Sequence, residues 1–104
     1  MPRKSIHTHQ NSILLALLKE CRHRRRLRQS DIAARLGWAQ ATVSNVERGE
    51  RRLDVIELRA WLFALETDYL DFITRLHERL PPGWTAVAAH PSVRHVKEQR
   101  SSGR

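Results

Sequence analysis

The sequence is nearly without cysteine, and this scarcity excludes two kinds of site. Cys21 is the single cysteine among 104 residues, so the chain can form neither an intrachain disulfide nor a metal site built on paired cysteines. No apolar run approaches the roughly 18 residues that a membrane-spanning helix needs. Residues 1–10 lead into no signal-peptide cleavage pattern. We therefore expect a soluble protein of the reducing cytoplasm, without a membrane partner.

The chain also lacks the side-chain combinations that catalysis and metal binding need. Its six histidines are scattered, and none stands at a motif spacing from a serine, cysteine or aspartate. His7 and His9 lie close together, but no carboxylate or thiolate is near them in the sequence, so we expect surface residues. The sequence thus predicts no enzymatic activity, no metal and no cofactor.

Positive charge is abundant and unevenly distributed. Lysine and arginine number 19 against 11 acidic residues, for a net charge of +8, and 16 of the 19 are arginines. Residues 1–52 carry +8, residues 53–80 carry −3, and residues 81–104 carry +3. The planar fork of arginine matches phosphates and base edges. A basic half is typical of a protein that binds duplex DNA, although a solvated basic surface has the same composition.

Apolar residues recur at helical spacing in five segments, and no segment alternates apolar and polar residues as a half-buried strand does. Helices are expected from Asn11 to about Arg25, over about 29–36, over about 40–48, and after the capping residues Asp54 and Asp68. We therefore predict an all-α protein. A compact five-helix domain over residues 11–80 would lie between a basic N-terminal arm (1–10) and a basic C-terminal tail (81–104).

The second and third expected helices have the pattern of a helix-turn-helix, with Gly37 in the short turn between them. Val43 and Val46 on the third helix would be buried, which leaves its other face for the major groove. Glutamine and asparagine pair with adenine, alanine contacts the thymine methyl, and serine serves either a base or a phosphate. The residues predicted to face base edges are Gln40, Ala41, Ser44 and Asn45.

The segment from Leu27 to Leu65 resembles the lambda-repressor and Cro type of helix-turn-helix, also called the XRE family. The residues that carry the resemblance are Gln29, Ile32-Ala33, Gly37, Val43-Ser44, Val46-Glu47-Arg48-Gly49 and Arg51-Arg52. It implies a lambda-repressor-like fold with phosphate contacts beside the reading helix. The residues assigned to phosphates are Arg28, Gln29, Thr42, Arg48, Arg51 and Arg52.

The resemblance also implies a structural ion pair between Arg22 and Glu47, which would lock the third helix to the first. The sequence departs from the family pattern at helix ends. Arg28 and Ala39 stand where serine or threonine usually caps a helix, at a cost of about 1 kcal/mol each. Glu66 replaces the glycine that commonly ends the fourth helix. These departures concern stability rather than the reading face.

The expected function is that of a sequence-specific transcriptional regulator of double-stranded DNA, associated with the nucleoid. The simplest form is a homodimeric repressor that reads two half-sites. Aromatic residues would form its dimer or partner surface, namely Trp61, Phe63, Tyr69, Phe72 and Trp84. Two alternatives remain open. One is the antitoxin of a toxin–antitoxin pair, which binds its operator and uses residues 81–104 to bind a toxin. The other is a protein-interaction adaptor with weak DNA binding.

Overall fold

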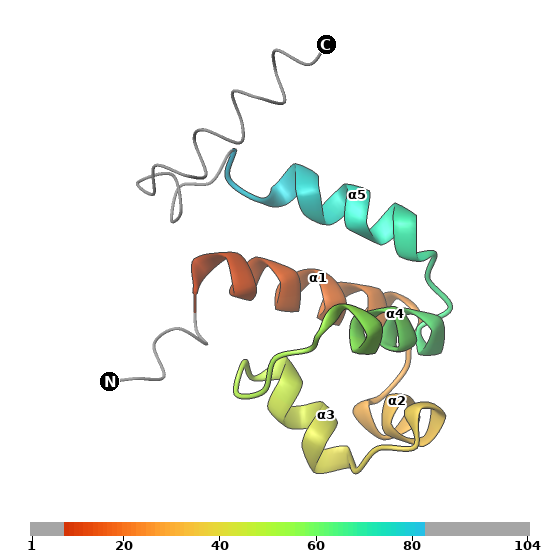
Figure 1. The fold of residues 1–104 in the computed structure, drawn as a ribbon. Coiled ribbons are helices and arrows are strands. Elements are labelled where there is room, and N and C mark those ends of the chain that lie inside the picture. Colours follow the sequence, from red (N-terminus) through yellow and green to blue (C-terminus); the bar gives the residue numbers. More distant parts are fainter. Residues whose placement is uncertain (1–7, 83–104) are drawn as a thin grey trace.

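The computed structural model describes residues 8–82, which form five α-helices and no strand (Figure 1). The helices are α1 (His9–Arg24), α2 (Gln29–Leu36), α3 (Gln40–Glu47), α4 (Val55–Ala64) and α5 (Tyr69–Arg79). The all-α five-helix prediction is confirmed. The first helix begins two residues earlier than expected, and Arg48 is the C-cap of α3 rather than a helical residue. Trp84 lies outside the described residues, as do positions 1–7 and 83–104 of the two terminal segments.

Short polar side chains explain where three of the helices begin. A side-chain oxygen at each N-cap accepts a hydrogen bond from a backbone N–H three residues later, and these N-caps are Thr8, Asp54 and Asp68. At α2 the roles are reversed, since Asp31 Oδ2 accepts from the Arg28 backbone N–H at 2.7 Å. Ala39 provides no side-chain cap for α3, as the sequence predicted.

Left-handed residues end several of the helices. Gly37 closes α2 with φ 73°, and the Trp38 N–H bonds back to Ala33 O at 3.0 Å. Arg26 after α1 and Glu66 after α4 adopt the same conformation, with φ values of 59° and 54°. A residue with a Cβ pays roughly 1 to 2 kcal/mol there. Glu66 therefore adopts the left-handed conformation that glycine usually provides after the fourth helix, at the cost of some backbone strain.

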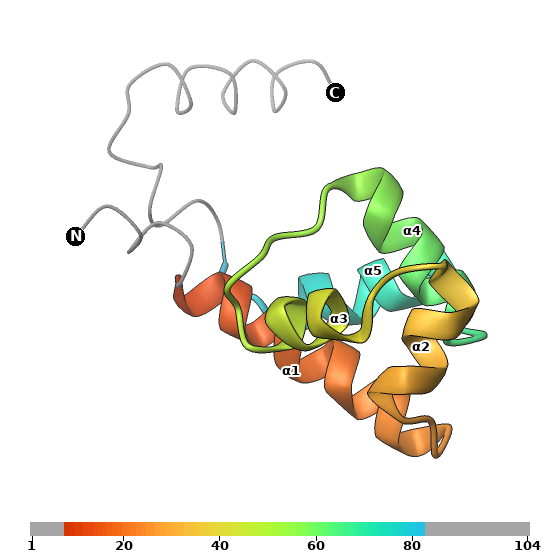
Figure 2. The same cartoon turned by 90° about the horizontal axis from the view of Figure 1, so that it is seen from below.

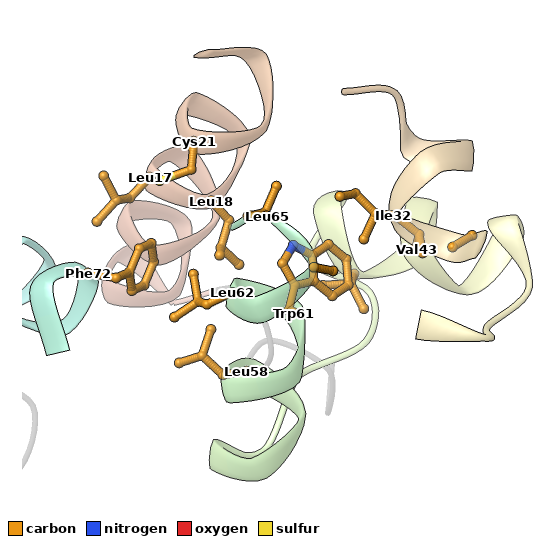
Figure 3. Packing of buried hydrophobic residues seen from close by; sticks show 13 residues of the cluster. Leu17, Leu18, Cys21, Ile32, Val43, Leu58, Trp61, Leu62, Leu65 and Phe72 are labelled. Carbon is orange, nitrogen blue, oxygen red and sulfur yellow. The ribbon is translucent and has the colours of Figure 1, made fainter. Parts of the chain in front are cut away.

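The helices enclose one core. α1 packs against α3 and α5, α2 packs against α3 and α4, and α4 contacts α5 (Figures 1 and 2). Each helix contributes to the buried cluster, much of which is labelled in Figure 3, and its fully buried large side chains are Leu17, Leu18, Ile32, Val43, Val46, Trp61, Leu62, Leu65 and Phe72. Among residues 8–82, no helix is long and apolar enough to cross a membrane.

The structure corrects the predicted aromatic surface at two positions. Trp61 and Phe72 are 0% exposed and belong to the core (Figure 3). The buried stripe of α4 passes through Trp61, whereas Val55 in the first turn is exposed. Tyr69 is half-buried against the core. Phe63 is 86% exposed, so it is the one aromatic residue of the described predicted set that lies open on the surface.

Candidate nucleic-acid interface

The face of α3 opposite the core carries the residues predicted to read bases. Gln40 and Ala41 in its first turn are exposed, and Ser44 and Asn45 in the next turn are half-buried. Val43 and Val46 on the other side of the helix are 0% exposed and hold it against the core. The outer face of α3 therefore carries two amides, a methyl and a hydroxyl, of which Gln40 and Ala41 are the more exposed. This is the chemistry that direct reading of the major groove uses.

Arg48, which was predicted to contact phosphate, lies over this same face. Its guanidinium donates hydrogen bonds to Ser44 Oγ and Asn45 Oδ1, and its Nη2 lies 3.5 Å from Glu50 Oε1. The contacts follow from spacing, because residues three and four apart in a helix are neighbours. Sequence reasoning missed this contact, although the i+3 and i+4 signal was present. Arg48 thereby orients two of the four predicted base-reading side chains.

A buried network beneath the reading face fixes the position of α3. Arg22 Nε and Nη2 donate to the two carboxylate oxygens of Glu47 at 2.7 and 2.9 Å, which is the ion pair implied by the family resemblance. Arg22 Nη1 also donates to Leu27 O at 2.9 Å. Gln29 Nε2 donates to Glu47 Oε1 at 2.9 Å. One carboxylate thus joins α1, α2 and α3, and the Gln29 amide assigned to phosphate is engaged inside the protein.

Arg51 is held between a ring and a carboxylate. Its guanidinium carbon lies 5.0 Å from the centroid of Trp38, in the turn between α2 and α3. Its Nη2 donates to Glu57 Oε2 at 3.0 Å. Trp38 in turn meets Trp61 edge to face, with centroids 6.0 Å apart. The loop after α3 is therefore tied both to the helix-turn-helix turn and to the core.

The Arg51 guanidinium, together with the Asp54 backbone N–H, holds the pKa of the Glu57 carboxyl below its ordinary value of 4.5. Ionised Glu57 consequently stabilises the fold above that value, and this contribution is lost as the pH falls through the lowered pKa. We expect Arg51→Met to raise the Glu57 pKa toward 4.5, as measured by NMR titration of the carboxyl carbon.

The internal control for this titration is Asp31. Its carboxyl pKa is lowered by the Arg28 backbone N–H and side chain, far from Arg51 in the sequence. The Asp31 pKa should be the same in both proteins. An unchanged Glu57 pKa in Arg51→Met would show that the bond to Arg51 is absent in solution.

The remaining residues assigned to phosphates differ in their exposure. Arg28 is exposed and pairs with Asp31 at 3.3 Å. Arg52 is exposed and Thr42 is half-buried. Within residues 8–82, no group of three or more His, Cys, Asp or Glu residues is placed to hold a metal ion.

Comparison with known proteins identifies the family. The family model described as "Helix-turn-helix domain" matches residues 13–69. A solved XRE-family-like protein from Pseudomonas syringae pv. tomato str. DC3000 is 40% identical, with a TM-score of 0.68, over 75% of this chain and 95% of that one. The chain belongs to the XRE family of helix-turn-helix proteins. No curated protein sequence matches it.

The same fold occurs in a protein of lower sequence identity. The restriction-modification controller protein C.Esp1396I is 22% identical, with a TM-score of 0.64, over 69% of this chain and 95% of that one. It has also been solved as a tetramer in complex with its natural 35 base-pair operator. The fold and family of the present XRE chain are those of DNA-binding transcription regulators.

Within this XRE chain, the structure brings together part of the set that the sequence singled out, since Gln29 is bonded inside the protein and Arg28 pairs with Asp31. Those assigned to bases share one face of α3, and Arg48 joins them. Sequence reasoning missed Trp38 and Glu57 as partners of Arg51. No local spacing links these three residues, since the turn, the loop and α4 meet only after folding.

Proposed function

We propose that this XRE-family protein is a homodimeric transcriptional repressor that reads a two-half-site operator with α3. The observation that carries the proposal is that α3 is held firmly against the core on one side and carries exposed residues able to read bases on the other. Glu47 anchors α3 by accepting three hydrogen bonds from Arg22 and Gln29, while Gln40 and Ala41 project into solvent. One recognition helix reads only about four base pairs, and a two-fold dimer doubles that number.

Related architecture supports an assembly with more than one copy. A controller protein of the same fold binds its operator as a tetramer. In the present chain the basic excess lies in residues 1–52, which contain the helix-turn-helix. Repeated contacts between that half and phosphates would supply the affinity that is independent of sequence, and α3 would supply the preference.

The test is a binding selection from a randomised duplex library, followed by gel shifts on the selected duplex and on a random duplex. Gln40→Ala should weaken binding to the selected duplex by about 5- to 100-fold and leave the random duplex nearly unaffected. Arg52→Ala, the matched control, should weaken both duplexes alike and reduce the salt dependence by about one counterion. Equal losses on both duplexes for Gln40→Ala would refute base reading by this residue.

The same selection tests the adaptor alternative. If no duplex is enriched, and gel shifts show no complex at low salt, the protein does not bind DNA specifically and the proposal fails. An enriched duplex with two related half-sites about one helical turn apart would support the dimeric form.

A further inference from the structure

Arg48 is the C-cap of α3, and its side chain lies back over the reading face. Side chains on a helix tilt toward its N-terminus, so a long residue covers the positions three and four earlier. The Arg48 guanidinium accordingly donates to Ser44 Oγ through Nη1 and to Asn45 Oδ1 through Nη2. Both acceptors belong to the set predicted to read bases. Arg48 therefore determines which of their polar atoms remain available to a duplex.

The turn after α3 holds the guanidinium in this place. Gly49 adopts the left-handed conformation, with φ 82°, and its N–H bonds to Val46 O at 3.0 Å. The Glu50 N–H bonds to Asn45 O at 2.8 Å, which completes a Schellman turn. The turn folds the chain back, and Glu50 Oε1 lies 3.5 Å from Arg48 Nη2. The guanidinium is thus held between two acceptors on α3 and one on the returning chain.

The bond to Arg48 fixes the orientation of the Asn45 amide. A guanidinium carries only donors, so the amide must turn its oxygen toward Arg48, since the opposite orientation would set N–H groups against N–H groups. The Nδ2 group, which carries both amide donors, then points away from Arg48. Ser44 is restricted in the same way, because its oxygen accepts from Arg48 and its hydroxyl proton must point elsewhere. Two side chains that could either donate or accept are left to act as donors.

We propose that Arg48 is a positioning residue that makes Asn45 read guanine. The inference rests on the proposed function, since it names the base that the middle of α3 would recognise. In the major groove guanine presents two acceptors, N7 and O6, whereas adenine presents the N7 acceptor and the N6 amino donor. The donors of Asn45 and Ser44 match the acceptors of guanine.

The bond to Arg48 also removes Asn45 from the ordinary pairing of asparagine with adenine. In that pairing the amide oxygen accepts from N6 and the amide nitrogen donates to N7. Here the amide oxygen already accepts from a charged donor. A charge-assisted hydrogen bond is about twice as strong as one between neutral groups, so the neutral amino group of adenine would not displace Arg48.

Glu50 favours the positioning role of Arg48 over a phosphate contact. Its carboxylate lies beside the guanidinium, so the two groups together carry no net charge. Affinity for the DNA backbone comes from neutralised phosphates and the counterions that they release. An arginine that shares its charge with a carboxylate adds less to this affinity. The main contribution of Arg48 is therefore to the polarity of the reading face.

The test is a binding selection from a randomised duplex library with wild type, Asn45→Ala and Arg48→Met. The half-site position whose preference disappears in Asn45→Ala is the one that Asn45 reads. Wild type should prefer guanine over adenine there by about 5- to 100-fold. Arg48→Met keeps the apolar stem but removes the donors, so it should reduce this ratio at least about 5-fold. Selection of any base other than guanine by wild type at this position would overturn the proposal.

Arg52→Met is the matched control. Arg52 is an exposed arginine that was also assigned to phosphate, and it lies beyond α3. Its replacement should weaken the guanine and adenine duplexes alike and leave their ratio unchanged. If Arg48→Met lowered both affinities in the same way and left the ratio unchanged, Arg48 would be a phosphate contact and the positioning role would be wrong. Circular dichroism checks that each variant is folded.

The double variant Asn45→Ala with Arg48→Met separates positioning from direct reading. If Arg48 acts through Asn45, the double variant should show the same ratio of guanine to adenine binding as Asn45→Ala alone. A further loss of guanine preference in the double variant would mean that Arg48 contacts a base itself, which would overturn the proposal.

A measurement without DNA keeps this inference separate from the proposed function. In the free protein, Arg48→Met should shift the NMR signals of the Asn45 side-chain amide, because its oxygen loses a charged donor. Identical signals in the two proteins would show that the hydrogen bond is absent, and the inference would fail. If wild type enriches a duplex with adenine at the Asn45 position, DNA reading stands and the inference fails. If it enriches no duplex, DNA reading itself fails, and the guanine assignment fails with it.

Discussion

Replacing Glu47 with alanine is expected to lower the free energy of unfolding by about 3 to 5 kcal/mol. Glu47 is 4% exposed and receives three hydrogen bonds, two from Arg22 and one from Gln29. Without it, the guanidinium of Arg22, which is itself 9% exposed, remains buried without its counter-charge. Urea denaturation followed by circular dichroism measures the loss, which is a large share of the roughly 5 to 15 kcal/mol that holds a domain folded.

Two comparisons isolate the effect of burial at Glu47. Glu50→Ala removes an exposed carboxylate 3.5 Å from Arg48 and should cost no more than about 1 kcal/mol. The double substitution of Arg22→Met with Glu47→Leu removes both charges together, so it should be much less damaging than Glu47→Ala alone. If Glu47→Ala cost no more than Glu50→Ala, the buried network would not be what fixes α3.

Replacing Trp61 with alanine is expected to destabilise the protein by about 3 to 5 kcal/mol. The side chain is 0% exposed and meets Trp38 edge to face, so its removal opens a large cavity between α4 and the helix-turn-helix. Thermal unfolding measures this loss. A surface role in dimer formation, which the sequence suggested for Trp61, would instead leave the monomer nearly as stable as before.

Phe63→Ala is the matched control on the same helix. Its ring is 86% exposed, so truncation should change the stability of the monomer by only about 0.5 kcal/mol. Both variants should be compared at a protein concentration low enough to keep the chain monomeric, because dimerisation adds to apparent stability. Equal losses for the two variants would contradict the assignment of Trp61 to the core and Phe63 to the surface.

The sequence predicted the helices because their signals are local. Asp54 and Asp68 cap the helices that follow them, and Gly37 ends α2 with a left-handed residue, as short-range patterns indicate. Family resemblance supplied the contact between Arg22 and Glu47, which lie 25 residues apart and are not linked by any local rule. The base-reading roles on α3 stay predictions.

The rotation of α4 could not be predicted in the same way. Apolar residues surround that helix, so periodicity alone left more than one face available to the core. Tertiary packing decides the matter, since both α2 and α5 contact α4 and Trp61 lies in the buried core. The stacking of Arg51 on Trp38 was missed for a related reason, because it joins a loop to a turn through tertiary packing.

The Glu47 network has a consequence for the thermodynamics of association. Because α3 is already joined to α1 and α2, a duplex would meet a helix whose angle is set in advance. The backbone of α3 would then lose little conformational entropy on binding. Most of the conformational entropy lost would be that of surface side chains such as Gln40. Recognition by this helix would resemble the docking of a rigid body, with its selectivity decided by a few side-chain rotamers.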